Sequence, residues 1–204
     1  MKLVVDYNNL VIVGLWNRHI FYPEWVGQYL LPETELTAEY PLNIAGSFRV
    51  SSDKIRIFVL GNRLHFVPLK ADLEVFDLIQ ETSLKVGTYL PHTPISAFGV
   101  NFLFEADSSE LTRDFLAVPD LDLLTNAGFT PESTSYSHII AVNGKKVNFT
   151  ISIKDSKVKF DLNYHFDVKN LVEFKERISN NSIVSLLNDS ENLVKSIYLK
   201  TNGI

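Results

Sequence analysis

Strict alternation of apolar and polar residues marks the middle of the chain, between Ile95 and Glu105. Four apolar side chains of this stretch fall on one side of an extended chain: Phe98, Val100, Phe102 and Phe104. A period of two is typical of a strand that has one face in a core. Because predicted hairpins lie on both sides of it along the chain, we expect this strand to be the centre of a sheet.

Gly61-Asn62 separates two further apolar stretches, Lys54–Leu60 and Arg63–Leu69. Glycine in the first position favours a type II′ turn, and a two-residue turn fixes the register of the two strands that it joins. In this register Phe58 lies opposite His65.

A second turn, at Ser52-Asp53, is predicted to add the strand Ser47–Ser51, and it places Arg49 directly opposite Arg56. The three strands then have one apolar face: Phe48, Val50, Ile55, Ile57, Val59, Leu64 and Phe66. The opposite face is mixed: Arg49, Arg56, Phe58, Leu60, Arg63, His65 and Val67. Like charges directly opposite each other destabilise a strand pair, so some other group must compensate the two arginines.

The N-terminal stretch predicts another hairpin, with strands Leu3–Asp6 and Leu10–Trp16 around Tyr7-Asn8-Asn9. Pro23 occupies a position typical of the first residue of a helix, and it predicts a short helix that ends before Pro32.

Helical spacing of apolar residues predicts a long helix over Ala71–Thr88, with Asp72 near its N-cap and Gly87 at its end. Beyond the central strand, Asp107-Ser108-Ser109-Glu110 has the pattern of a capping box. It predicts a second helix that continues to about Ala117.

The region Ser135–Phe166 predicts a three-stranded meander, because Asn143-Gly144 is a strong hairpin signal and Asp155-Ser156 marks a second turn. Counting back from the first turn places His138 opposite Phe149. Both side chains are expected on the core face of the meander.

The C-terminal part keeps helical spacing from Leu171 to Tyr198, with breaks predicted at Asn180-Asn181 and at Asp189-Ser190. Strands followed by helices indicate an α+β fold. We therefore predict a single α+β domain over residues 1–204, with an antiparallel sheet built from two hairpin groups around the central strand 95–105 and with helices packed on one face.

Three features of this order can be compared with known families: paired hairpins that lead to a helix of about 20 residues, the strand pattern Pro94-Ile95-x-Ala97-x-Gly99-x-Asn101, and a closing strand, Val158–Phe166, before amphipathic helices. In these features the chain resembles a sporadically distributed family of uncharacterised bacterial proteins, known as conserved hypotheticals. The resemblance implies an accessory protein of the bacterial cytoplasm. It implies no activity and no catalytic residue.

Composition narrows the functional classes. Of the 204 residues, 46% are hydrophobic and 14 are phenylalanine, enough for a sizeable core. A net charge of -5 argues against attraction of the whole surface to nucleic acid or to an anionic membrane. The chain has no cysteine, which excludes disulfides, thiolate metal sites and cysteine nucleophiles. No apolar run approaches the ~18 residues of a membrane span, so we expect a cytoplasmic protein without a membrane partner.

Motifs of catalysis and of cofactor binding are absent from the sequence. The nine glycines form neither GxGxxG nor GxxxxGK[ST], and no GxSxG elbow occurs. The five histidines show no HxH, HxxxH or HExxH spacing. We therefore expect no cofactor, no metal site and no catalytic residue in a recognisable motif.

One pair of residues could still serve acid–base chemistry. Asp161 and His165 share the polar face of the meander, but four residues along a strand separate them by about 13 Å. They would need groups from elsewhere in the chain to act on one substrate.

The candidate binding residues lie on the mixed face: Arg49, Arg56, Phe58, Arg63 and His65. Arginine together with aromatic residues is typical of protein interfaces. A second interpretation is a surface for nucleic acid or a phosphorylated ligand, with arginine for phosphate and Phe58 for stacking. A third is that Glu35, Glu39 or Glu105 neutralises the arginines within the chain.

We expect a non-catalytic binding or assembly protein, a subunit or accessory factor of a larger bacterial complex. Its partner would be another protein or a second copy of the chain, and nucleic acid is the less favoured partner. The alternative function is a hydrolase-like enzyme that acts on nucleic acid or a phosphate-bearing ligand. Its site would combine Arg, Asp and His residues that are distant in sequence.

Overall fold

Ten strands among the described residues form one antiparallel sheet in the computed structural model, which confirms the predicted α+β class. The structure describes residues 1–7, 9–32, 35–41, 48–112, 121–130 and 132–200. The chain divides into two compact units, and both β7 (Ile95–Asp107) and β10 (Lys157–Asp167) have residues in each of them. The single-domain assignment therefore stays a prediction.

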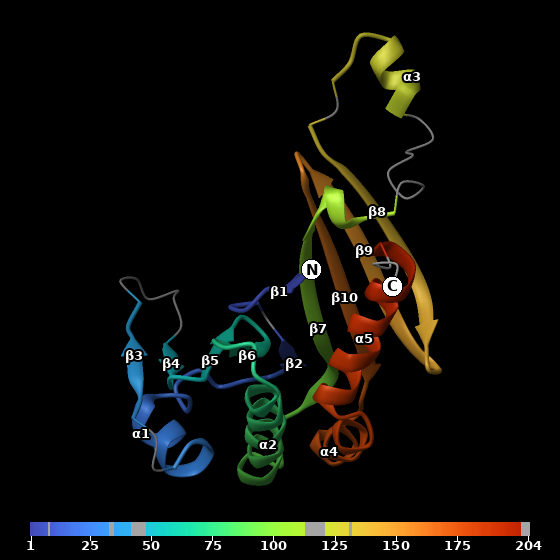
Figure 1. The fold of residues 1–204 in the computed structure, drawn as a ribbon. Coiled ribbons are helices and arrows are strands. Elements are labelled where there is room, and N and C mark those ends of the chain that lie inside the picture. The colour runs from blue at the N-terminus through green and yellow to red at the C-terminus, as the bar shows by residue number, and fades with distance from the viewer. Residues whose placement is uncertain (8, 33–34, 42–47, 113–120, 131, 201–204) are drawn as a thin grey trace. The chain divides into compact units, whose positions relative to one another are not determined.

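Unit 2 comprises residues 5–101 and 164–186. Its strands follow the order β3-β4-β5-β6-β2-β7 (Figure 1). They are β2 (Leu10–Gly14), β3 (Thr37–Glu39), β4 (Arg49–Ser51), β5 (Ile55–Leu60), β6 (Arg63–Pro68) and the first part of β7. The main helical elements of this unit are α1 (Pro23–Trp25), the π-helical turn η1 (Val26–Leu30), α2 (Leu73–Tyr89) and α4 (Leu171–Asn180).

Helix α2 begins after Asp72, as predicted, but Gly87 does not end it. The helix continues to Tyr89, and Gly87 is buried within it. A Cβ atom at this position would lie only 2.9 Å from Cδ of Lys175 on α4. The glycine therefore permits the close approach of two helices, which is a packing role that its position near the predicted helix end concealed.

The predicted N-terminal hairpin is wrong. β1 (Lys2–Leu3) belongs to unit 1 and pairs with the second part of β7, whereas β2 lies between β6 and β7 in unit 2. Leu10 on β2 faces both Phe66 and Val100. A strand between two neighbours has the backbone groups of both its edges hydrogen-bonded, which pairing with the two-residue β1 would not achieve.

Unit 1 comprises residues 1–4, 102–163 and 187–204, as far as they are described. Its strand order is β7-β10-β9-β8, with β1 also paired to β7. The remaining elements are β8 (Thr134–Val142), β9 (Lys145–Lys154), the 3₁₀ turn η2 (Ser108–Glu110), α3 (Leu121–Asn126) and α5 (Ile183–Tyr198), whose first turn belongs to unit 2.

The first hairpin of the predicted meander is confirmed in its register. His138 lies opposite Phe149, and Asn143 and Gly144 have the positive φ angles, 49° and 76°, of a type I′ turn. Tyr198 of α5 packs against Phe149, with ring centroids 5.7 Å apart. His138 itself is exposed, because an edge strand has a neighbour on one side only, so its expected place in the core is wrong.

Two helix boundaries also differ from prediction. The capping box at Asp107 forms, but it opens only the 3₁₀ turn η2, because Leu111 is extended and forms a bridge with Leu199. The rest of that predicted helix, residues 113–117, lies outside the described residues. The break between α4 and α5 is confirmed, whereas α5 continues through Asp189-Ser190.

No described helix is both long and apolar enough to cross a membrane.

Phe98 joins three elements of unit 2. Its ring stacks on Phe166 of β10 at 4.6 Å between centroids and meets Phe174 of α4 edge-on at 5.0 Å. We predict that Phe98→Ala lowers the free energy of unfolding by about 3–5 kcal/mol, because it leaves a cavity among these rings. Val172→Ala, on the exposed side of α4, should change it by less than about 0.5 kcal/mol. Urea titrations of both variants check this, and equal effects would contradict the described core.

Candidate functional site

The five candidate binding residues lie on one face of three neighbouring strands in unit 2. β4 carries Arg49, β5 carries Arg56 and Phe58, and β6 carries Arg63 and His65. The opposite face of the same strands is apolar and completely buried at Val50, Ile57, Leu64 and Phe66. The predicted separation into an apolar and a mixed face is therefore confirmed.

The hairpin between β5 and β6 has the predicted register. Phe58 lies opposite His65, and Leu60 lies opposite Arg63. Gly61 has a φ of 60°, the value that a type II′ turn requires at its first position. This pairing brings an aromatic ring, an imidazole and a guanidinium group onto adjacent positions of one face.

The predicted opposition of Arg49 and Arg56 is wrong, because the turn lies one residue later than expected. Oγ of Ser52 accepts hydrogen bonds from the backbone N–H groups of Lys54 and Ile55, both at 3.1 Å. Ser52 is thus the last paired residue of its strand, and its N–H donates to the carbonyl of Ile55 at 2.9 Å. The register shifts by two residues, so that Arg49 faces Phe58 and Ser51 faces Arg56.

The shift replaces a charge repulsion by a cation–π contact. Cζ of Arg49 lies 5.5 Å from the centroid of the Phe58 ring. The same guanidinium group lies 3.6 Å from Glu39 on β3, the strand beside β4. Both side chains of this ion pair are half exposed, so solvent weakens it.

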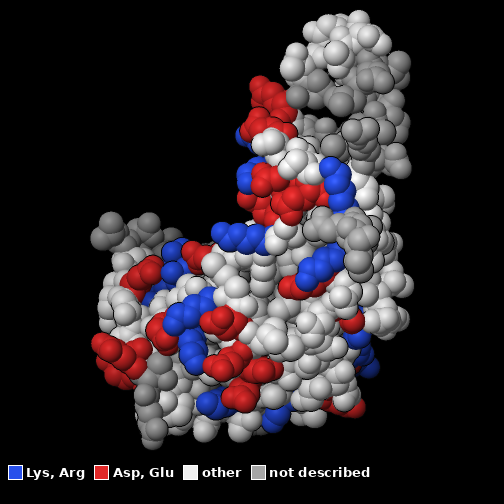
Figure 2. All heavy atoms as spheres, in the orientation of Figure 1, with Lys and Arg blue, Asp and Glu red and all other residues white. Residues whose placement is uncertain are grey.

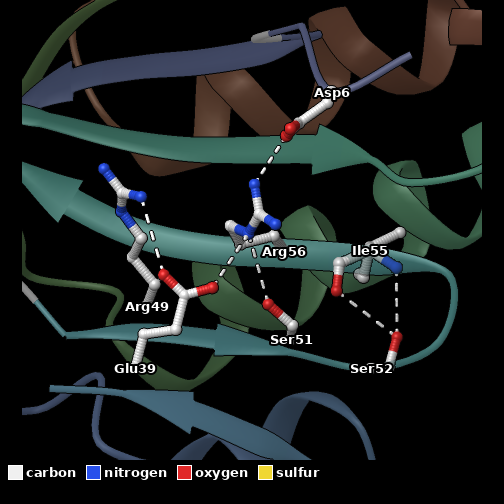
Figure 3. Close-up of polar contacts among 7 residues, drawn as sticks. All are labelled: Asp6, Glu39, Arg49, Ser51, Ser52, Ile55 and Arg56. Carbon is white, nitrogen blue, oxygen red and sulfur yellow. Dashed lines mark hydrogen bonds and ion pairs between the residues drawn. The ribbon is translucent and has the colours of Figure 1, made fainter.

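Arg56 is held more tightly than Arg49. Its Nη1 lies 2.5 Å from Oδ1 of Asp6, its Nε lies 4.0 Å from Oε1 of Glu39, and Nε also donates to Oγ of Ser51 at 3.3 Å (Figure 3). Only 21% of the Arg56 side chain is exposed. Of the three carboxylates weighed as internal partners, only Glu39 takes this role: Glu105 pairs with Lys157, and Glu35 forms no ion pair with a described residue.

Asp6 is a partner that sequence reasoning missed. It lies three residues after the end of β1, and the sequence predicted it at the end of a strand in a hairpin that does not form. In the structure Asp6 has a φ of 62°, and its N–H donates to the carbonyl of Pro68 at 2.9 Å. No local pattern signals this contact, which depends on the path of the chain between β1 and β2.

Arg63 and His65 differ from Arg49 and Arg56 because no carboxylate of the described residues is bound to them. Arg63 is exposed, and none of the described residues forms an ion pair with it. His65 is only 6% exposed and stacks on Phe58, with ring centroids 4.7 Å apart and planes at 4°. Neither of its ring nitrogens has a hydrogen-bond partner among the described residues.

The environment of His65 keeps its imidazole neutral. Burial, and to a smaller extent the nearby positive charge of Arg63, lowers the pKa of His65 from 6.5 to about 4. A neutral imidazole has one donor and one acceptor nitrogen. Since buried polar atoms are normally hydrogen-bonded, two ring nitrogens without a partner in the described part of the chain are an unusual feature of this face.

His165, one member of the predicted acid–base pair, has a carboxylate other than that of Asp161 beside it. His165 pairs with Asp167 at 3.1 Å, two residues along the same strand, and both side chains are well exposed. Within the described part of the chain, no three His, Asp or Glu side chains come together in a way that could hold a metal ion.

Comparisons with known proteins give no further assignment: no protein-family model matches the chain, and no curated protein matches it. The resemblance to a bacterial family of conserved hypotheticals thus stays a prediction.

The pH dependence of stability offers a test of the buried imidazole. Because the pKa of His65 is lower in the folded protein, the unfolded chain binds its proton first as the pH falls. Above pH 6.5 His65 is neutral in both states and does not reduce the free energy of unfolding. As the pH falls from 6.5 towards 4, protonation of the unfolded chain should reduce this free energy by up to about 3 kcal/mol. We predict that His65→Phe, which keeps a ring against Phe58, removes this part of the pH dependence. Free energies of unfolding of the wild type and of His65→Phe, measured at several pH values, test this prediction. Identical pH profiles of the two proteins would refute it.

The two arginine pairs should contribute unequally to stability. We predict a coupling energy of about 1 kcal/mol or more between Arg56 and Asp6, because Arg56 is partly buried and hydrogen-bonded. The exposed pair of Arg49 and Glu39 should couple by only about 0–0.5 kcal/mol. Double-mutant cycles with alanine, followed by urea unfolding, compare the two pairs. A larger coupling for Arg49 would contradict the described arrangement.

Proposed function

We propose that this protein is a non-catalytic binding or assembly protein that docks another protein through the mixed face of β5 and β6. The docking surface would consist of four residues: Phe58, Leu60, Arg63 and His65. Arg49 and Arg56, which were expected to take part directly, instead support this surface from its side through their contacts with Phe58, Glu39 and Asp6.

The observation that carries this proposal is the exposed pair of Leu60 and Arg63 beside the stacked rings of Phe58 and His65. Both ring nitrogens of His65 are covered and have no hydrogen-bond partner among the described residues, so a docked partner could bond to them only if neighbouring side chains move. The neighbouring side chains suit a protein surface: Leu60 is 57% exposed, Phe58 is half buried, and Arg63 is exposed and forms no ion pair with a described residue. Aromatic residues and arginine contribute most of the binding energy at many protein interfaces.

Charge argues against nucleic acid as the partner. A phosphate backbone needs several unpaired cations, and on this face two of the three guanidinium groups are already bound by carboxylates. Lys and Arg side chains lie among Asp and Glu side chains on the face drawn in Figure 2. The net charge of -5 acts in the same direction.

An enzymatic role for His65 has less support. A histidine that acts as a general base usually has its second nitrogen oriented by a hydrogen bond, often from or to a carboxylate or a backbone carbonyl. No described residue provides that contact. The geometry therefore favours recognition over catalysis at this face.

Affinity capture with variants that change the charge of this face tests the proposal. A lysate of the source organism would be passed over three immobilised, tagged proteins: the wild type, Arg63→Glu and Leu60→Asp. The retained proteins would be identified by mass spectrometry. Lys159→Glu, which reverses an exposed lysine in unit 1, is the matched control. We expect one protein to be retained by the wild type and the control, and its purified form to bind both face variants at least about tenfold more weakly.

Two results would contradict the proposal. One is a partner that binds all variants equally well while their melting temperatures match that of the wild type. The other is the recovery of nuclease-sensitive nucleic acid, lost in Arg63→Glu, in place of a protein.

A further inference from the structure

The outer strand of unit 1, as far as the structure describes it, lacks the proline, charge and short length that normally protect a sheet edge. β8 is nine residues long and ends the strand order of the sheet. It contains no proline, lysine, arginine or carboxylate between Thr134 and Val142. Natural edge strands are usually short, charged or interrupted, because their free N–H and C=O groups can pair with another strand.

The other end of the strand order shows such protection. β3 has only three residues, one of which is Glu39, and Pro41 follows two positions later. Glu39 is in addition engaged in the ion pair with Arg49. The contrast makes β8 the edge at which strand addition is to be expected.

The turn after β8 determines which of its backbone groups point outward. In a two-residue type I′ hairpin the flanking residues, here Val142 and Lys145, form a hydrogen-bonded pair. Hydrogen-bonded and non-bonded pairs then alternate along an antiparallel ladder. Four residues of β8 therefore direct both their N–H and their C=O away from β9: Ser135, Ser137, Ile139 and Ala141.

We propose that β8 pairs antiparallel with β8 of a second copy of this chain, so that two sheets join edge to edge around a two-fold axis. One register uses all four outward residues of each copy. Ser135 of one copy lies opposite Ala141 of the other, Ser137 lies opposite Ile139, and the two-fold axis generates the two equivalent pairs. This register forms about eight backbone hydrogen bonds and centres the axis on His138. The inference concerns unit 1 and does not depend on the docking surface proposed above.

The side chains of β8 suit this partner. The strand carries no fixed charge, so an identical copy brings no repulsion between like charges. Ile139 is 70% exposed in the middle of the strand, on a face whose other β8 side chains are the small ones of Ser135, Ser137 and Ala141. In the proposed register the two copies of Ile139 lie diagonally across the axis, within about 7–8 Å, so that each covers part of the other.

The absence of cysteine allows a direct test by cross-linking. His138 is exposed, and in this register it faces its own copy in a non-hydrogen-bonded pair with Cα atoms about 4.5 Å apart, near the range of a disulfide. His138→Cys should therefore form a covalent dimer under mild oxidation. Ser135→Cys is the matched control: it is also exposed on β8, but its copy would be six residues away, about 20 Å.

Proline at an outward position supplies the second test. Ile139→Pro removes an N–H group that does not bond to β9, so the hairpin should remain folded while pairing to a second copy is lost. Ile139→Thr is the control, because it removes the exposed aliphatic group and keeps the N–H. Analytical ultracentrifugation should show a dimer for the wild type, a weaker dimer for Ile139→Thr and a monomer for Ile139→Pro.

Three results would overturn the inference. They are a wild type that stays monomeric up to high concentration, a dimer that persists in Ile139→Pro, and Ser135→Cys that cross-links as readily as His138→Cys. If Ile139→Pro fails to fold, the two cysteine variants alone decide the question. A captured partner lost only in Arg63→Glu leaves this inference untouched, so the two proposals can fail separately.

Discussion

The turn at Ser52 is the local constraint on which the mixed face depends. One side-chain oxygen accepts two backbone N–H groups and thereby makes Asp53-Lys54, and not Ser52-Asp53, the loop of the hairpin. A shift of one position in the loop moves the register by two residues, which keeps every side chain on its face but changes its neighbour. Arg49 consequently meets the ring of Phe58 in place of a second guanidinium group.

This register divides the three arginines and the histidine of the face into two kinds. Arg49 and Arg56 are neutralised by Glu39 and Asp6 and stiffen the strands that carry them. Arg63 and the neutral imidazole of His65 stay without partners among the described residues. The face thus combines two arginines that are fixed by carboxylates with an arginine and an imidazole that have no polar partner among the described residues.

Sequence reasoning succeeded wherever short turns with strong residue preferences set the structure. Gly61-Asn62 and Asn143-Gly144 gave two hairpin registers that the structure confirms, and alternation gave the central strand. It also separated the apolar from the mixed face. Alternate residues of a strand stay on the same face even when the turn is predicted one residue too early.

It failed where a distant part of the chain decides the outcome. The partners of β1 and β2, the contact of Asp6 with Arg56 and the burial of Gly87 against Lys175 all join residues far apart in sequence. Asp189-Ser190 looks like a break but stays helical, because Asp189 accepts from Asn143 at 2.8 Å and lies 3.8 Å from Lys145. The unsatisfied state of His65 is likewise invisible in the sequence, since it is a property of the surroundings.

The division of unit 2 between two separated segments has a consequence for how the chain folds. Its first segment ends at residue 101, and the segment that supplies Phe166 and Phe174 begins only at residue 164. On the ribosome, the aromatic contacts of Phe98 must therefore wait until the intervening meander has been synthesised. Such non-local pairing slows folding, and it exposes the apolar side of β7 to chaperones in the meantime.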